Sequence, residues 1–193
     1  MGKGRLEAFT DGVMAIVITI MVLEMRVPQG TDFAAVQAAI PIFLAYVLSY
    51  VNVGIFWNNH HHMLHAATRV DGRVLWANLF LLFWMTMVPF VIRWIDEAGI
   101  TVLPVAAYGV VLAMAALGYT LLEWALIACS GQTETLAAAV GKDVKGRLSL
   151  GIYVAAIPLA FVSVWIAIAL YVFVALIWFV PDRRIETVMK RVG

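Results

Sequence analysis

Residues 33–68 read FAAVQAAIPIFLAYVLSYVNVGIFWNNHHHMLHAAT, a run of 36 residues without an aspartate, glutamate, lysine or arginine. Three further runs lack these four residue types and cover residues 74–92, 98–122 and 148–181. A helix needs about 20 apolar residues to cross the hydrocarbon core of a bilayer. The runs therefore predict an all-α integral membrane protein.

The composition of the whole chain favours the same class. Of its 193 residues, 64% are hydrophobic and 13% are charged, whereas a soluble domain has about 45–50% and about 25%. This excludes a soluble enzyme and a disordered chain, because too few polar side chains are present to cover a globule. A net charge of +1 gives no reason to expect a nucleic-acid partner. The only cysteine, Cys129, has no second cysteine with which to form an intrachain disulfide.

The number of spans depends on the run 148–181, which has 34 residues. One helix of that length would reach about 51 Å, beyond a hydrocarbon core of about 30 Å. We therefore expect two short helices with a turn near residues 158–163, where a proline and a serine lie. Together with helices near 8–25, 33–68, 74–92 and 100–129, this predicts six spans in a single domain, residues 1–193.

Charge bias supports six spans and orients them. With six spans, eleven lysines and arginines lie on the side of the termini, and two, Arg26 and Arg93, lie on the other side. With five spans the division would be seven against six. The positive-inside rule therefore predicts that both termini are cytoplasmic. The polar segment 130–147 is then a cytoplasmic loop, too short for a catalytic domain.

The first helix differs from an ordinary span. Its uncharged part, residues 12–23, covers about 18 Å and is closed by Asp11 and Glu24. An ionisable group on a spanning helix costs roughly 2.5–3.5 kcal/mol at the centre and usually faces protein or water. Two interpretations follow: the helix lines a water pathway, or Asp11 and Glu24 reach the two interfaces of a thin, tilted helix.

Residues at helical spacing form one face of this helix, here called the first-helix stripe: Phe9, Gly12, Ile16, Thr19, Ile20 and Leu23. If the stripe faced a pore, Ile16, Ile20 and Leu23 would form its narrow part, with the Thr19 hydroxyl beside them. Alternatively, the stripe is ordinary helix packing. Asp11 lies about 140° from Ile16 around the helix and needs a partner on a neighbouring helix.

Candidate partners for Asp11 lie at the end of the second helix. Trp57, His61 and His65 follow one another at intervals of four residues, close to the predicted depth of Asp11. Indole and imidazole N–H groups stabilise a carboxylate. A zinc site at His61 and His65 is disfavoured, because no HExxH glutamate is present and acids are sparse nearby. Haem is disfavoured, because all four histidines lie on one helix.

Two motifs resemble a known channel family. Residues 5–19 read RLEAFTDGVMAIVIT and match an R-x-x-x-F-S-D signature, with Thr10 in place of the usual serine. Trp57-x-Asn59-His60-His61 resembles a second-helix motif of the same family. On these residues the chain resembles the transmembrane protein 175 family, the endolysosomal potassium channel and its bacterial relatives.

The resemblance implies a fold and a function. Bacterial members have six helices per subunit and form homotetramers in the inner membrane, in which four first helices surround a pore without a P-loop. Potassium would be the permeant ion, no cofactor or metal would be needed, and the chain would not be an enzyme. By position relative to the signature, Ile16, Ile20 and Leu23 would form the constriction, and Thr19 would be the layer that favours potassium.

The same resemblance implies an interhelical network that holds the pore helix, formed by Arg5, Phe9, Thr10, Asp11, Trp57 and His61. His61 is chosen over His60 because it lies four residues from Trp57. Threonine at position 10 keeps the hydroxyl of serine and adds a methyl group, so the network is expected to survive.

Two other classes of function remain open. Asp11 and the histidines suit a proton-conducting channel or a proton-coupled transporter, although no inverted repeat is visible. A membrane-embedded enzyme or assembly factor would have to use Glu123, an acid within the fourth predicted helix that has no evident catalytic partners.

Overall fold

The computed structural model describes residues 2–67, 69–130 and 143–179, and all the regular elements in these ranges are helices. The helices are α1 (Lys3–Leu23), α2 (Phe33–Ala66), α3 (Gly72–Thr86), α4 (Val88–Ala98), α5 (Val102–Ser130), α7 (Val144–Ala160) and α8 (Val164–Phe179). The predicted all-α class is confirmed. Residues 131–142, most of the predicted cytoplasmic loop, and the basic C-terminal residues 183–191 lie outside the described residues.

The predicted division of residues 148–181 into two helices is confirmed. α7 ends at Ala160 and α8 begins at Val164, and the backbone N–H of Ser163 donates to the Leu159 carbonyl in the turn. α7 and α8 have 17 and 16 residues, lengths of about 26 Å and about 24 Å. Each is near the lower limit for a span.

The predicted helix over residues 74–92 is interrupted once. α3 ends at Thr86 and α4 begins at Val88, with Met87 between them. Pro89 has no N–H to continue the helical ladder, which accounts for the break. α3 and α4 together still form one apolar segment, Gly72–Ala98. It is one of four described segments that can cross a membrane by length and composition, with Lys3–Leu23, Phe33–Ala66 and Val102–Cys129.

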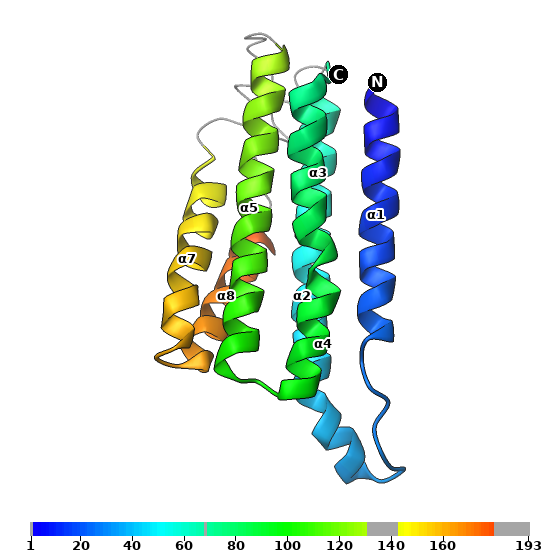
Figure 1. Ribbon diagram of the computed structural model, residues 1–193, viewed down its shortest axis with the longest axis vertical. Coiled ribbons are helices and arrows are strands. Elements are labelled where there is room, and N and C mark those ends of the chain that lie inside the picture. The colour runs from blue at the N-terminus through cyan, green and yellow to red at the C-terminus, as the bar shows by residue number, and fades with distance from the viewer. Residues whose placement is uncertain (1, 68, 131–142, 180–193) are drawn as a thin grey trace.

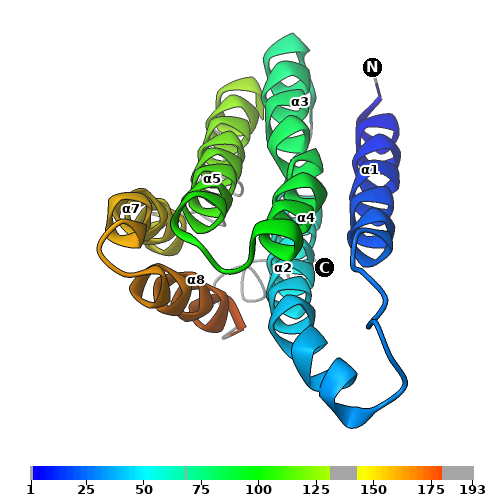
Figure 2. The same cartoon turned by 60° about the horizontal axis from the view of Figure 1, so that its bottom comes forward.

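α1 lies at one edge of the subunit, and α7 and α8 lie at the opposite side, as Figures 1 and 2 show. α1 contacts α2, α3 and α4. α5 lies at the centre, between α3 and α7. The edge position leaves one side of α1 without a neighbour among the helices that the structure describes.

Small residues let α5 approach its neighbours closely. A methyl group at Gly118 would lie 2.9 Å from the Leu81 Cα of α3, and one at Gly109 would overlap the Tyr171 hydroxyl of α8. Van der Waals packing of this kind holds helices together in a bilayer, where lipid offers apolar side chains as good a surrounding as protein does. α5 therefore serves as the central element against which the others pack.

Candidate functional site

The first-helix stripe is exposed along its whole length in the subunit. Ile16 is 57% exposed and Leu23 is 79% exposed, and Phe9 and Ile20 are exposed as well. The opposite face of α1 is buried against α2, α3 and α4 and consists of Leu6, Thr10, Met14, Val17 and Met21. α1 thus presents an apolar face on each side, and the described residues of the subunit cover only one of them.

Thr19 is the polar member of the stripe. Its hydroxyl donates to the Ile16 carbonyl of its own helix, at 2.9 Å. The hydroxyl proton is used in that bond, so the oxygen remains exposed as an acceptor beside Ile16 and Ile20.

A groove with a volume of about 490 Å³ runs beside the stripe, between α1 and α4. Ile16 and Ile20 line it from α1, and Pro89, Phe90 and Arg93 line it from α4. The groove and the stripe share residues, so one packing partner could cover both.

Asp11 has the partner that the sequence predicted. The Trp57 indole Nε1–H donates to the Asp11 carboxylate at 2.8 Å. The His61 ring stacks on Trp57 and the His65 ring stacks on His61, with 6.2 Å between ring centroids in each pair. This hydrogen bond joins α1 to α2 at Asp11, and a stack of three rings along α2 supports it.

Thr10 belongs to a second cluster, separate from Asp11. The Asn78 amide of α3 donates to the Thr10 hydroxyl at 2.9 Å, and its carbonyl oxygen accepts from His60 Nε2 at 2.8 Å. All three side chains are at most 1% exposed. This cluster joins α1, α2 and α3 by bonds that water does not reach, and in it the connected histidine is His60.

Sequence reasoning missed Asn78. It is an amide side chain inside the run 74–92, whose 19 residues include no charged one. A polar group in the middle of a span requires a partner inside the protein. The sequence therefore indicated that Asn78 has a partner. It did not indicate which residue the partner is, because that depends on how α3 is rotated against α1. The spacing from Trp57 similarly identified the stacked His61 and gave no indication of the buried His60.

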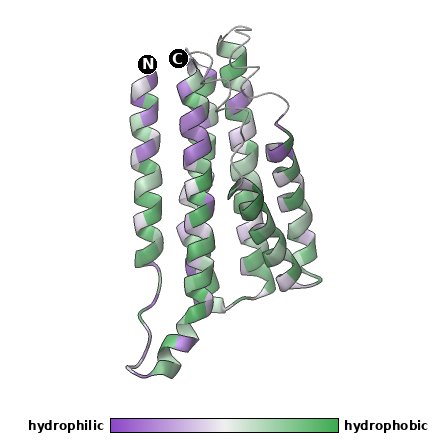
Figure 3. Ribbon diagram, turned by 180° about the vertical axis from the view of Figure 1, so that it is seen from behind, coloured by the Kyte–Doolittle hydropathy of each residue, from purple (hydrophilic) through white to green (hydrophobic). Residues whose placement is uncertain are grey.

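Figure 3 shows the hydrophilic residues of α1 and α2 gathered toward the end where α1 begins and α2 finishes. There the Lys3 ammonium donates to the His65 carbonyl at 3.0 Å. Arg5 is exposed and makes no ion pair with any described residue. Phe9 is exposed on the stripe and takes no part in either hydrogen-bonded cluster.

The other end of α1 is held by ion pairs with α4. The Arg93 guanidinium contacts Glu24 and Glu97, each at 3.1 Å, and Arg26 contacts Asp96 at 3.6 Å and Glu97 at 3.4 Å. Glu24 therefore has a cationic partner, Arg93, at the C-terminal end of α1. α1 is fastened at both ends and near Thr10 and Asp11, while its stripe stays free.

Within the described ranges, no three His, Cys, Asp or Glu side chains are grouped so that they could hold a metal ion. Glu123 is buried on α5 and belongs to neither hydrogen-bonded cluster. The fold and the site together define a polytopic helical membrane protein with an anchored edge helix that exposes an apolar stripe.

Comparison with known proteins identifies the family. The family described as endosomal/lysosomal potassium channel TMEM175 matches residues 5–89. A potassium channel of Chryseobacterium sp. is 48% identical over 98% of this chain and 99% of its own length, and one of Streptomyces collinus is 32% identical over 90% of each. The chain belongs to the TMEM175 family, a family of ion channels.

A solved structure and a human protein are also similar to this chain. The crystal structure of a lysosomal potassium-selective channel TMEM175 homolog from Chamaesiphon minutus matches with a TM-score of 0.78 and 28% identity, over 91% of this chain and 95% of that one. The human endosomal/lysosomal proton channel TMEM175 is 41% identical over 37% of this chain and 17% of its own length.

Proposed function

We propose that this chain is the subunit of a potassium-permeable channel whose pore is lined by α1. The observation that carries the proposal is the uncovered first-helix stripe on an edge helix that is fastened at both ends. The bacterial relatives named potassium channels, which align over nearly the whole chain, support the choice of ion.

The proposed assembly is a homotetramer with four copies of α1 around the axis. The groove between α1 and α4 supports this arrangement, because a neighbouring copy could pack there and cover the flank of the stripe. We place six spans in the bacterial inner membrane with both termini cytoplasmic, as the bias of eleven basic residues against two favours.

Ile16, Ile20 and Leu23 would form the constriction. A ring of such side chains can close a pore by excluding water. When the ring is wide enough to conduct, potassium loses its water more readily than sodium, because it is larger and more weakly hydrated. No backbone carbonyl cage replaces the lost shell, so we expect a modest preference for potassium, with Thr19 Oγ1 supplying acceptors beside the ring.

Asp11, Thr10, Trp57 and the histidines would act as positioning residues. Their bonds to α2 and α3 fix the rotation of α1 about its own axis, and a helix turned by one residue moves its side chains by 100°. The rotation decides which residues face the axis, so the network would set the composition of the constriction.

A second candidate function is proton conduction. The human relative is named a proton channel, and Asp11, Trp57, His61 and His65 form a continuous row of ionisable and aromatic groups along α1 and α2. Intramembrane carboxylates and histidines are the usual members of a proton relay.

Flux measurements on reconstituted protein separate the two functions. Vesicles loaded with potassium are diluted into sodium medium with a pH-sensitive dye. A potassium channel makes the interior negative, and protons then enter only when a protonophore is added. Vesicles loaded with sodium and diluted into a medium of an impermeant cation measure sodium flux for comparison. Dye quenching that requires the protonophore and is faster with potassium supports the proposal, and quenching with valinomycin alone would assign proton conduction instead.

A further inference from the structure

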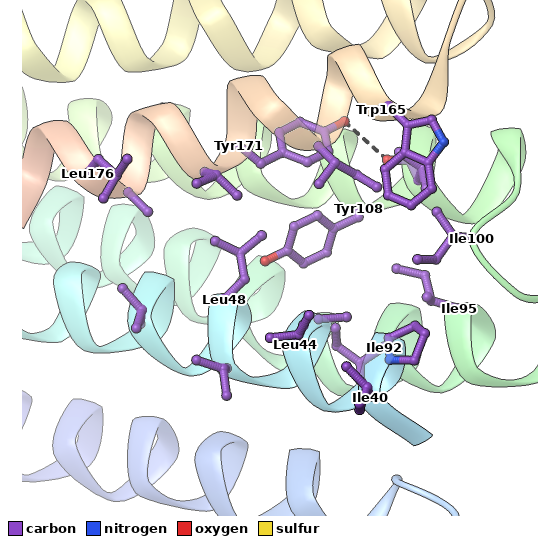
Figure 4. A pocket seen from close by; sticks show the side chains of 18 of the residues that line it. Ile40, Leu44, Leu48, Ile92, Ile95, Ile100, Tyr108, Trp165, Tyr171 and Leu176 are labelled. Carbon is purple, nitrogen blue, oxygen red and sulfur yellow. Dashed lines mark hydrogen bonds between the residues drawn. The ribbon is translucent and has the colours of Figure 1, made fainter. Parts of the chain in front are cut away.

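The subunit contains a second apolar recess, on the side away from α1. A groove with a volume of about 510 Å³ lies between α2 and α8 and is floored by α4 and α5 (Figure 4). We call it the α2–α8 groove. The residues at its rim are exposed: Leu44 is one of them, and the exposed fraction of Trp165 is 65%. The residues at its floor, such as Ile92 and Tyr108, are buried.

The polar side-chain groups of the groove lining are few: the Trp165 indole N–H at one end, and two hydroxyls. The two hydroxyls among its lining residues belong to Tyr108 and Tyr171, and both are already hydrogen-bonded inside the protein. Ser49 donates to the Tyr108 hydroxyl at 2.9 Å, and the Tyr171 hydroxyl donates to the Val105 carbonyl at 3.1 Å. A buried water needs two to four polar partners, and apolar cavities without them stay dry and take up apolar guests.

The length of the groove matches one leaflet of a bilayer. Its lining extends from Ile40 to Val51 on α2, which is about 17 Å of helix. Half of a hydrocarbon core is about 15 Å. One end of the groove lies by Ile95, Ile100 and Trp165, at the α4–α5 connection (Figure 4). Tryptophan is enriched at the headgroup level of membranes.

We propose that the α2–α8 groove binds one acyl chain of a bilayer phospholipid, with the headgroup at the Trp165 end. A phospholipid is the occupant that supplies a straight apolar chain of one leaflet's length next to a polar group. Another copy of the protein is not expected there, because α1 lies on the axis of the proposed channel and α8 lies on the other side of the subunit (Figure 2). This last step rests on the proposed function.

The test uses a photoactivatable lipid. The full-length protein is reconstituted in vesicles of phosphatidylethanolamine and phosphatidylglycerol that contain phosphatidylcholine with a diazirine in its acyl chain. After illumination, labelled residues are mapped by mass spectrometry. We expect label on the floor residues Ile92, Val105 and Tyr108, which are buried and which only an inserted chain can reach.

Two variants fill the groove and have matched controls on α7. Val172→Trp acts at the half-exposed rim and Ala175→Phe at the floor, and Val154→Trp and Ala155→Phe place the same side chains on an exposed face of α7. Each added side chain occupies the space of the acyl chain, so labelling of the floor residues should be largely lost in both variants. The α7 variants should leave it unchanged.

Two results would overturn the proposal. One is an unlabelled floor in the unsubstituted protein while exposed residues such as Trp124 are labelled, since the groove would then be closed or covered by protein. The other is floor labelling that persists in both filled variants. Ion flux plays no part in this measurement. The channel proposal could therefore fail while lipid binding is observed, and lipid binding could fail while ion flux is observed.

Discussion

Thr10 and Asp11 are adjacent in the sequence and serve different contacts. One step along a helix turns a side chain by 100°, so Thr10 faces Asn78 of α3 while Asp11 reaches Trp57 of α2. Two neighbouring polar residues thereby fasten α1 to two different helices. Rotation of α1 is opposed from both directions.

At Ile16 we expect a substitution to change ion permeation directly. Ile16→Asn replaces an apolar ring of the proposed constriction by a polar one, which removes the barrier to wetting. Potassium flux into liposomes should rise, and the preference for potassium over sodium should fall. Val154→Asn, on an exposed face of α7, is the control and should leave both quantities unchanged. Equal flux in the two variants would remove Ile16 from the pore.

At Asn78 we expect a loss of stability. Asn78→Leu keeps the approximate size of the side chain and leaves the Thr10 hydroxyl and the His60 ring without their partner. Each buried polar group left unpaired costs about 1–3 kcal/mol. The thermal unfolding temperature of the purified protein should fall. Asn58→Leu, at an exposed position of α2, should have little effect, and equal unfolding temperatures for both variants would show that the cluster contributes nothing.

At the scale of the helices, the uncharged runs predicted most of what the structure contains. They located α2, the α3–α4 segment and α5, and the length of residues 148–181 required a break between α7 and α8. The interruption at Met87 was not predicted, since one proline in an apolar run is compatible with several local geometries. The partners of Thr10 depend on packing between helices, which periodicity within a helix does not specify.

The contact between α3 and α5 gives a prediction at this scale. Gly118→Val would place a side chain against the Leu81 backbone, where the added Cβ alone would lie 2.9 Å from the Leu81 Cα. Overpacking of this kind costs about 1–3 kcal/mol. The yield of folded protein and its unfolding temperature should both fall. Gly151→Val, on α7 with no atom within 4 Å of its added Cβ, should behave like the unsubstituted protein, and a similar loss there would point to a general intolerance of valine.

At the scale of the whole molecule, an apolar face of a membrane protein is compatible with lipid or with another protein. The sequence therefore left open whether the first-helix stripe faces a pore or is ordinary helix packing. The stripe belongs to a helix that is fastened at both ends and near Thr10 and Asp11. A helix that only met lipid would not require such a fixed rotation, since lipid accepts any apolar face equally well.

Assembly should depend on this fixed rotation. Asp11→Ala removes the acceptor for the Trp57 indole, which is one of the contacts that fix the rotation of α1. We expect the variant to lose the proposed tetramer in light scattering of the detergent-solubilised protein. Asp11→Asn keeps a side-chain oxygen at the same place and should retain more of the assembly, although a neutral acceptor is weaker than a carboxylate.

The comparison of these two variants separates the hydrogen bond from the charge. If Asp11→Ala were still a stable tetramer with unchanged ion preference, positioning of α1 through Asp11 would be wrong. If Asp11→Asn were as defective as Asp11→Ala, the negative charge at residue 11 would be the required feature. Intact assembly in Asp11→Asn together with loss in Asp11→Ala is the result that would make the Trp57 hydrogen bond the contact that couples the structure of the subunit to the proposed tetramer.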